Sequence, residues 1–271
     1  MAADKFAVNK GAGVSGIVSD VDSGRTASPE KSRAFVSVRN VTKVFSTAAG
    51  EKFALKDVSF EIAEGSCTVI GGENGSGKSV LMSIVAGLTE CDSGSVECGG
   101  RAGLVFQEAE TQILGETPAE DVAFGPKNLG WKRERIAAAV KSALERTGFT
   151  EKADFPARFL SGGEKRRLAV ACMLAMELPV IILDEPYANL DYGGVKQVNA
   201  LVRSLKEQGK TVIILTHEIE KCLGLADHFI VLFRGEKVFD GTPAEGLSQN
   251  LESWNIRNPL VSYKAVKDLQ W

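Results

Sequence analysis

The sequence predicts an α/β fold in which buried strands alternate with helices, and three segments carry this prediction. The glycine-rich segment 72–79 lies between a β-rich apolar run, Ser66–Ile70, and a helical stretch, Ser79–Leu88. Two later runs, Val180–Leu183 and Thr211–Leu215, are continuously apolar, which is typical of strands buried on both faces. Strands of this kind pack into open sheets, which bind ligands at the carboxyl ends of their strands.

Segment 72–79 reads GENGSGKS and fits the pattern G-x-x-x-x-G-K-S/T. In this pattern the glycines let backbone N–H groups surround a phosphate, the lysine adds positive charge, and the serine hydroxyl reaches Mg²⁺. The strand before the loop and the helix after it favour this interpretation over a plain glycine-rich turn. We expect Lys78 to act in catalysis as well as in binding. The predicted nucleotide-binding residues of this loop are Gly72, Asn74, Gly75, Ser76, Gly77, Lys78, Ser79 and Val80.

A second motif, LSGGEKRR at residues 160–167, predicts the start of a helix. Ser161 can cap the helix, because Glu164 follows three residues later and completes a capping box. The free N–H groups and the positive end of the helix dipole then face an anion at Gly162 and Gly163. We therefore expect Ser161, Gly162 and Gly163 to contact the phosphates of a nucleotide.

Polar residues follow both of the buried apolar runs. Asp184 and Glu185 end the first run, so that Asp184 can hold Mg²⁺ while Glu185 polarises the attacking water. His217 follows the second run, where it can donate a hydrogen bond to a γ-phosphate. The alternatives are an acidic turn and a structural histidine. The other histidine, His228, lacks such neighbours, and we interpret it as structural.

Gln107 follows a further short apolar run, Gly103–Phe106. A neutral amide can bind Mg²⁺ and can donate a hydrogen bond to water, which suits a residue that enters and leaves a site. A glutamine at a strand end means little by itself, but this one lies between the phosphate loop and the LSGGE motif. The predicted Mg²⁺ ligands are therefore Ser79, Gln107 and Asp184.

The segments found so far, in their order and spacing, resemble the ATP-binding-cassette (ABC) ATPases. The resemblance implies a P-loop NTPase core with a mixed sheet, an antiparallel β subdomain and an inserted α-helical subdomain, with ATP and Mg²⁺ as ligands. It also implies that Phe45, upstream of ALKDVSF, stacks on adenine, although a core phenylalanine is the alternative. The matching segments are GENGSGKS at 72–79, Gln107, LSGGE at 160–164, VIILDEP at 180–186, ANLD at 188–191 and His217.

Within that family, residues 106–130 are similar to the ATPase subunits of energy-coupling-factor (ECF) transporters, which import vitamins and transition-metal ions. This resemblance implies an ATP-hydrolysing, energy-coupling subunit that works with polytopic membrane subunits and a separate solute-binding membrane protein. The membrane subunit is expected to insert a helix into a groove beside Gln107. Three departures from the family pattern are Glu108-Ala109-Glu110, Tyr187 and Tyr192.

The resemblance also implies a dimer, in which the LSGGE helix of one subunit completes the phosphate-loop site of the other. The partner is either a second copy of this chain or a related ABC ATPase. Two other classes of function remain open at this point. One is a non-transport ABC ATPase for DNA repair or translation, and the other is a regulatory ATP-binding module that does not hydrolyse ATP.

Composition limits these possibilities further. A chain of 271 residues with 44% hydrophobic and 25% charged residues is typical of a soluble globular protein. A net charge of -3 and a pI near 5.6 indicate no general attraction for nucleic acid. No apolar run approaches the length of a membrane span, so we expect a cytoplasmic protein held at the cytoplasmic face of the cell membrane by its partners. Free thiols are expected at the five scattered cysteines, Cys67, Cys91, Cys98, Cys172 and Cys222.

The chain also divides by composition along its length. Trp254 and Trp271, near its end, are expected to pack either on the core or at a subunit contact. The predicted parts are a flexible N-terminal tail at 1–34, an ABC ATPase domain at 35–245 with a helical subdomain at about 111–177, and a C-terminal extension at 246–271 that is a possible subunit contact.

Overall fold

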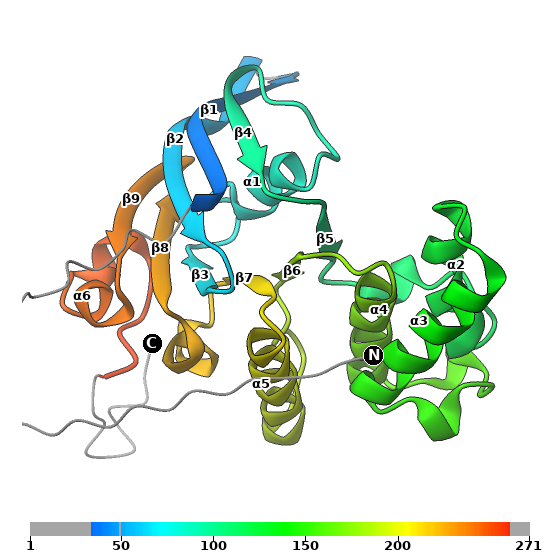
Figure 1. Cartoon of the computed structure of the whole chain (residues 1–271). Coiled ribbons are helices and arrows are strands. Elements are labelled where there is room, and N and C mark those ends of the chain that lie inside the picture. Colours follow the sequence, from blue (N-terminus) through cyan, green and yellow to red (C-terminus); the bar gives the residue numbers. More distant parts are fainter. Residues whose placement is uncertain (1–33, 49, 261–271) are drawn as a thin grey trace, which may run out of the picture. The chain divides into compact units, whose positions relative to one another are not determined.

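The structure of the chain is a computed structural model that describes residues 34–48 and 50–260. The predicted tail at 1–34 lies outside the described residues except for Ala34, and so does Trp271. The helices and strands are shown in Figure 1. No helix within the described ranges combines the length and the apolarity that crossing a membrane requires.

A six-stranded sheet forms the centre of the described part, and its strands are parallel except for the last. Ile181 and Leu183 of the predicted strand at 180–183 face one core cluster, whereas Ile182 faces the other. Both faces of this sheet are therefore buried, which explains why its strands read as continuous apolar runs. In sheet order the strands are β5 (Ala102–Val105), β6 (Val180–Asp184), β7 (Thr211–Thr216), β3 (Cys67–Gly71), β8 (His228–Phe233) and β9 (Glu236–Gly241).

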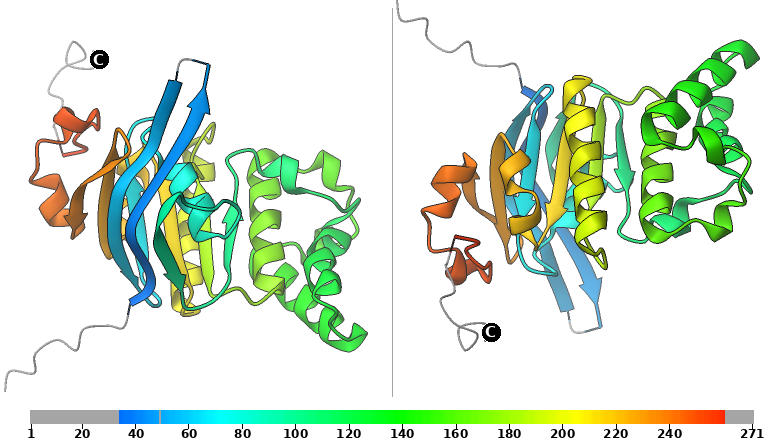
Figure 2. Two further views of the ribbon diagram at one scale, coloured as in Figure 1. Left: turned by 90° about the horizontal axis from the view of Figure 1, so that it is seen from above. Right: turned by 90° about the horizontal axis from the view of Figure 1, so that it is seen from below.

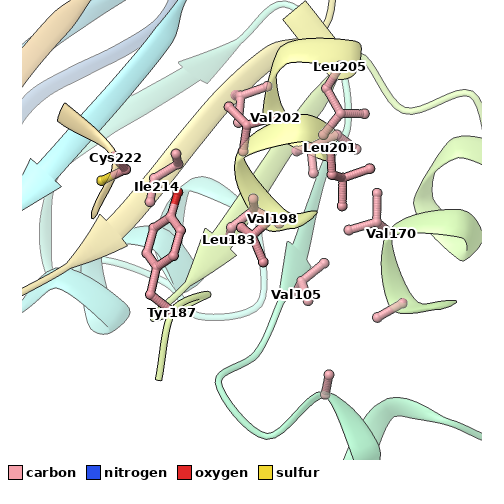
Figure 3. Packing of buried hydrophobic residues seen from close by; sticks show 14 of the residues in the cluster. Val105, Val170, Leu183, Tyr187, Val198, Leu201, Val202, Leu205, Ile214 and Cys222 are labelled. Carbon is pink, nitrogen blue, oxygen red and sulfur yellow. The ribbon is translucent and has the colours of Figure 1, made fainter. Parts of the chain in front are cut away.

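Helices cover the two faces of this sheet, as Figure 2 shows from two sides. On one face lies α5 (Tyr192–Glu207), and Figure 3 shows its Val198 beside Leu183 of β6. On the other face lies α1 (Lys78–Val85), whose buried Leu81 belongs to the second core cluster. The nucleotide-loop helix is therefore fixed to the sheet through its apolar side.

An antiparallel sheet of three strands packs on the far side of α1. Its order is β2-β1-β4, with β1 (Ala34–Thr47), β2 (Gly50–Ala63) and β4 (Ser93–Cys98). The β1–β2 hairpin pairs Phe45 with Lys52, and this end of the hairpin reaches the nucleotide loop described below. The mixed central sheet and the separate antiparallel sheet agree with the fold class that the sequence predicts.

Three helices form a group beside β5, at the edge of the central sheet (Figure 1): α2 (Pro118–Asn128), α3 (Arg133–Thr147) and α4 (Gly162–Ala175). The sequence does not indicate α2, because Gly125 and Pro126 interrupt its helical pattern. Its start is nevertheless well defined, since the Thr117 hydroxyl accepts a hydrogen bond from the Glu120 backbone N–H.

The last described segment packs against the end of the central sheet. After α6 (Pro243–Leu247), a 3₁₀ turn, Leu251–Trp254, buries Leu251 in the larger core cluster. The ring of Trp254 lies 6.4 Å from that of Phe239 on β9, so Trp254 packs on the core rather than standing free. On the same strand pair, His228 Nε2 lies 2.7 Å from Oδ1 of Asp240, which gives that histidine a structural contact.

Candidate nucleotide-binding site

The phosphate loop joins β3 to α1, and its shape depends on two glycines. Gly72 and Gly77 have φ angles of 150° and 105°. A Cβ on Gly72 would lie 2.3 Å from the Leu232 carbonyl oxygen, and one on Gly77 would lie 2.5 Å from that of Ala54. Gly75 also has a positive φ, of 84°, but a Cβ there would meet no atom within 4 Å. The loop is thus tightly packed behind and open in front, as a phosphate cradle requires.

Lys78 is buried at the base of this loop. Its Nζ donates hydrogen bonds to the carbonyl oxygens of Gly72, at 2.7 Å, and Glu73, at 3.0 Å. The same nitrogen lies 3.7 Å from Oε1 of Glu185. Burial lowers the pKa of Lys78, whereas the carboxylates of Glu185 and Asp184 oppose that change. The ammonium group is already buried and donates to two main-chain oxygens of the loop. It can therefore turn toward a phosphate without the cost of burying a charge anew.

Glu185 is the buried residue that follows β6, and its backbone adopts φ +45°. Such a conformation costs on the order of 1 kcal/mol in a residue other than glycine. It places Oε1 3.0 Å from Nδ1 of His217, which is the donor because a carboxylate only accepts. The other carboxylate oxygen, Oε2, has no hydrogen-bond partner among the described residues. Glu185 therefore has one oxygen held by cationic or donor groups and one oxygen free to accept from a water molecule.

Asp184 lies at the end of β6, next to the start of α1. Burial raises the pKa of Asp184, and a hydrogen bond with Ser79 opposes this change. Its Oδ1 has no hydrogen-bond partner within the described part of the chain. An orphaned carboxylate oxygen beside a hydroxyl is a donor set that suits a hard divalent cation, so these two residues fit Mg²⁺.

These groups border a cavity of about 290 Å³. The cavity brings together residues from the hairpin, the phosphate loop, the segment after β5 and the end of β6. Among the predicted site residues, Ser161, Gly162 and Gly163 do not line it, whereas His217 and Asp184 adjoin it through Glu185 and Ser79. The lining residues are Phe45, Lys52, Phe53, Ala54, Asn74, Gly75, Gly77, Lys78, Ser79, Val80, Gln107 and Glu185.

The other two loop residues predicted from the motif, Gly72 and Ser76, are buried behind the cavity. The Ser76 carbonyl oxygen accepts a hydrogen bond from the Gly235 N–H, which ties the loop to the turn between β8 and β9. Gly72 closely approaches the end of β8. Both residues therefore shape the loop from behind.

Two aromatic rings form the outer wall of the cavity. Phe45 is 43% exposed, which rules out the alternative of a core phenylalanine. Phe53 from β2 is 48% exposed and lines the same cavity, and the sequence analysis did not identify it. The one feature of the sequence that could have indicated Phe53 is its position in the strand that pairs with β1 in the hairpin. The Nζ of Lys43 lies 5.7 Å from the centre of the Phe45 ring, which shows that this ring already accepts a cation on its face.

We expect Phe45→Ala to weaken ATP and ADP binding on the order of 10-fold, because the stacking of one base on an aromatic ring contributes about 1–3 kcal/mol. Binding of inorganic triphosphate, which has no base, should not change. Phe124→Ala is a matched control, because Phe124 is similarly exposed, at 46%, but lies on α2 away from the cavity. Calorimetric titration measures all three ligands. An unchanged ADP affinity in Phe45→Ala, with a tenfold loss in Phe53→Ala, would transfer the stacking role to Phe53.

The LSGGE motif begins α4 as predicted. Ser161 caps the helix by accepting a hydrogen bond from the Glu164 N–H at 3.3 Å, and the Glu164 carboxylate accepts one from the Ser161 N–H at 2.8 Å. An ion pair with Lys152 and this backbone bond lower the pKa of Glu164 to about 2. A Cβ on Gly162 or Gly163 would meet no atom within 4 Å. Nothing within the described chain therefore requires glycine here, whereas a close ligand or a second subunit would.

Gln107 is exposed at the mouth of the cavity, on the loop where Glu108-Ala109-Glu110 departs from the family pattern. This loop is held by Gln112, which the sequence analysis did not identify. The Gln112 side chain accepts a hydrogen bond from the Phe106 N–H at 2.8 Å and donates one to the Leu104 carbonyl oxygen at 2.9 Å. The side chain of Gln112 therefore closes the loop on itself.

The same loop is also tied to α4. Glu110 forms an ion pair with Lys165 at 2.9 Å, and the buried Arg166 donates a hydrogen bond to the Gln107 carbonyl oxygen at 3.3 Å. Two residues of the LSGGEKRR motif thus contact the glutamine loop directly. A movement of Gln107 would be transmitted to the helix that carries Ser161.

The chain is similar in sequence to known proteins. Residues 55–188 match the ABC transporter family. The energy-coupling factor transporter ATP-binding protein EcfA2 of Thermotoga maritima is 40% identical over 230 residues, which are 79% of this chain and 85% of that protein. The corresponding protein EcfA of Methanocaldococcus jannaschii is 36% identical over 77% of this chain and 81% of its own length. A Methanosarcina mazei protein named as an ABC transporter ATP-binding protein is 36% identical, and the chain spans 49% of its length.

Solved structures agree with these relatives. CbiO1 of Clostridium perfringens, described as part of the ABC transporter complex CbiONQ, has a TM-score of 0.72 and 31% identity, over 83% of this chain and 96% of that chain. The ATP-binding cassette MJ0796, in a dimeric post-hydrolysis state with ADP and Pi, has a TM-score of 0.68 and 28% identity, over 77% of this chain and 98% of that chain.

The chain therefore belongs to the ATP-binding subunits of ABC transporters, which are P-loop ATPases. Within this family it is an energy-coupling ATPase of the ECF type. The resemblance predicted from residues 106–130 is thus confirmed, and so is the predicted fold class.

Proposed function

We propose that this chain binds ATP and Mg²⁺ at the described cavity and hydrolyses ATP to drive a membrane importer. The observation that carries this proposal is the position of Glu185. One oxygen of its buried carboxylate contacts both Lys78 and His217. The other oxygen has no partner among the described residues and can accept a hydrogen bond from water. A carboxylate held in this way beside a phosphate cradle is suited to orient and deprotonate a water molecule.

In the proposed reaction, the N–H groups of the loop hold the phosphates, and Lys78 turns its donors from the loop carbonyls to the phosphate oxygens. Water attacks the γ-phosphorus, the bond from this phosphorus to the bridging oxygen of ADP breaks, and Glu185 accepts the proton of the water. His217 turns its N–H from Glu185 to an oxygen of the γ-phosphate. Ser79, Asp184 and Gln107 would hold Mg²⁺, which neutralises charge on the β- and γ-phosphates when it is bound.

The site is completed by a second ATPase subunit in this proposal. The support for it is the pair of glycines at the start of α4, where an added Cβ would meet no atom of the described residues within 4 Å and which do not line the cavity of their own chain. The helix start offers unpaired N–H groups and a positive dipole end to the γ-phosphate of the partner's ATP. The partner is a second copy of this chain or a related ABC ATPase.

A second cavity supports the predicted contact with a polytopic membrane subunit. It has a volume of about 410 Å³ and lies between the end of α1, β5 and the ends of α2 and α4. Leu88 and Phe106 line it and are partly exposed, and Gln112 links it to the glutamine loop. Its lining is mostly apolar, which suits an apolar helix face. Because Phe106 precedes Gln107, a helix in this groove would be coupled to the nucleotide site.

We expect Leu88→Asp to abolish retention of the membrane subunit by a tagged chain, because the substitution places a charge in the apolar groove. Leu88 is 61% exposed, so the fold should tolerate it. Leu260→Asp is the matched control, since Leu260 is 72% exposed and lies outside the groove. Co-purification from detergent-solubilised membranes measures retention, and ATP binding by the isolated chain checks the fold. Normal retention by Leu88→Asp would contradict the groove assignment.

The cargo class follows only from the resemblance to ECF transporters. We propose a vitamin or a transition-metal ion, bound by a separate solute-binding membrane protein, with this chain at the cytoplasmic face of the cell membrane. Steady-state phosphate release by the assembled complex distinguishes this role from a regulatory ATP-binding module, which would show none. Capture of a polytopic membrane protein distinguishes it from an ATPase of DNA repair or translation.

A further inference from the structure

Tyr187 is a fully buried residue two positions after Glu185, where the sequence departs from the family pattern. Its hydroxyl donates a hydrogen bond to the Asn199 side-chain oxygen at 2.8 Å. Burial raises the pKa of Tyr187 far above its usual value, so the hydroxyl keeps its proton. Figure 3 shows this hydroxyl pointing into the core, toward Ile214. Tyr187 thus connects the loop that follows Glu185 to α5.

Asn199 continues this connection. It lies on α5, and its side-chain NH₂ donates a hydrogen bond to the carbonyl oxygen of Lys221 at 2.8 Å. Lys221 ends the 3₁₀ turn, Ile219–Lys221, that comes directly after His217 and Glu218. A continuous path of two hydrogen bonds therefore connects the loop of Glu185 with the turn that follows His217.

The turn has further internal contacts that make it a single unit. Lys221 forms an ion pair with Glu218, and the Glu218 N–H donates to the hydroxyl of Thr216 at 2.9 Å. The His217 side chain, by contrast, is 45% exposed and contacts the protein through Glu185. Its direction therefore depends on the backbone of the turn. Tyr187 is fully buried, whereas Asn199 and Lys221 are half-buried, and the hydrogen bonds that join them favour one geometry of the backbone to which they are bonded.

We propose that Tyr187 is a positioning residue for ATP hydrolysis, acting through Asn199 and Lys221 to hold the His217 turn against Glu185. The residue that departs from the family pattern thus sets the relative position of two groups of the site. This inference rests on the proposed catalytic roles of Glu185 and His217. It predicts that the hydroxyl of Tyr187 affects the rate of hydrolysis more than it affects ATP binding.

The test is Tyr187→Phe, which keeps the ring and removes the hydroxyl. In the assembled complex we expect kcat to fall on the order of 10-fold, since small displacements of catalytic groups are costly, with KM for ATP within about twofold of wild type. Asn199→Ala should give the same split, and the double variant should lose no more than either single one. Tyr192→Phe is the control, because Tyr192 carries its hydroxyl on a ring that is 80% exposed.

A further variant with two substitutions separates positioning from stability. Tyr187→Phe combined with Asn199→Leu replaces both polar partners with apolar groups, which can restore much of the lost stability. We expect its Tm to recover toward wild type while its kcat stays low, because Lys221 still lacks its donor. Recovery of kcat together with Tm would show that the network acts only through stability and would overturn the inference.

The inference and the proposed function fail in different ways. Wild-type kcat in Tyr187→Phe, with an inactive Glu185→Gln, overturns the inference alone. Wild-type turnover in Glu185→Gln removes the proposed role of Glu185 and the inference with it. A rise in KM with unchanged kcat would assign Tyr187 to nucleotide binding and would also overturn the inference.

Discussion

Glu185→Gln is expected to bind ATP with nearly normal affinity and to lose hydrolysis by about 10²–10⁴-fold, the range that a positioned general base contributes. Glutamine keeps the shape of the side chain and its oxygen acceptor but cannot take a proton from water. We expect ATP to close the pair of subunits and hydrolysis to open it again, so the variant should accumulate as an ATP-bound dimer. Phosphate release measures turnover, and size-exclusion chromatography with and without ATP measures the dimer.

Glu177→Gln is the matched control for this variant. Glu177 is an exposed carboxylate that pairs with Arg135 at 2.7 Å and does not line the cavity. Its loss should leave turnover unchanged, because exposed ion pairs contribute little. Fast hydrolysis by Glu185→Gln would remove this residue from its role, and a monomer in ATP would contradict the proposed closure.

Gly163→Ala is expected to lower ATP turnover on the order of 10- to 100-fold without destabilising the single chain, because loss of one donor to a developing anion costs about this much or more. A methyl group on Gly163 meets nothing within the described chain, and alanine favours helix more than glycine does. The methyl group would instead stand between the helix start and the phosphate of the partner's nucleotide. The Tm of the isolated chain should therefore stay the same or rise.

Gly224→Ala controls for the loss of a glycine. A Cβ on Gly224 also meets nothing within 4 Å, and this residue lies on a 3₁₀ turn, Leu223–Leu225, outside the cavity lining. We expect full turnover in this variant. Full turnover in Gly163→Ala as well would mean that no phosphate or second subunit approaches the start of α4 closely.

Much of the fold could be predicted because several elements carry strong local signals. The predicted strand Val180–Leu183 is β6 with one residue added, and the predicted cap at Ser161 is the cap of α4. Continuous apolar runs and a capping box are signals that one short segment contains by itself. In contrast, α2 contains Pro126, and its helix is stabilised by packing on α4 rather than by its own propensity.

The parts of the site that could not be predicted depend on contacts between distant segments. Phe53 reaches the cavity only because the β1–β2 hairpin places it opposite Val44, beside the phosphate loop. Gln112 matters because its side chain folds back on two backbone groups of the glutamine loop. The Tyr187–Asn199 bond spans a loop and a helix. No pattern of residue types in the chain indicates such pairs, because each of these residues by itself is of a common type for the strand, loop or helix in which it lies.

We propose that two subunits share each nucleotide, and the structure of Glu185→Gln with ATP and Mg²⁺, in complex with its partner ATPase, would show whether they do. We expect the γ-phosphate to lie between Lys78 of one subunit and the LSGGE helix start of the other, with the N–H groups of Gly162 and Gly163 within hydrogen-bond distance. A closed complex in which all phosphate contacts come from a single chain, and both helix starts face solvent, would contradict the account.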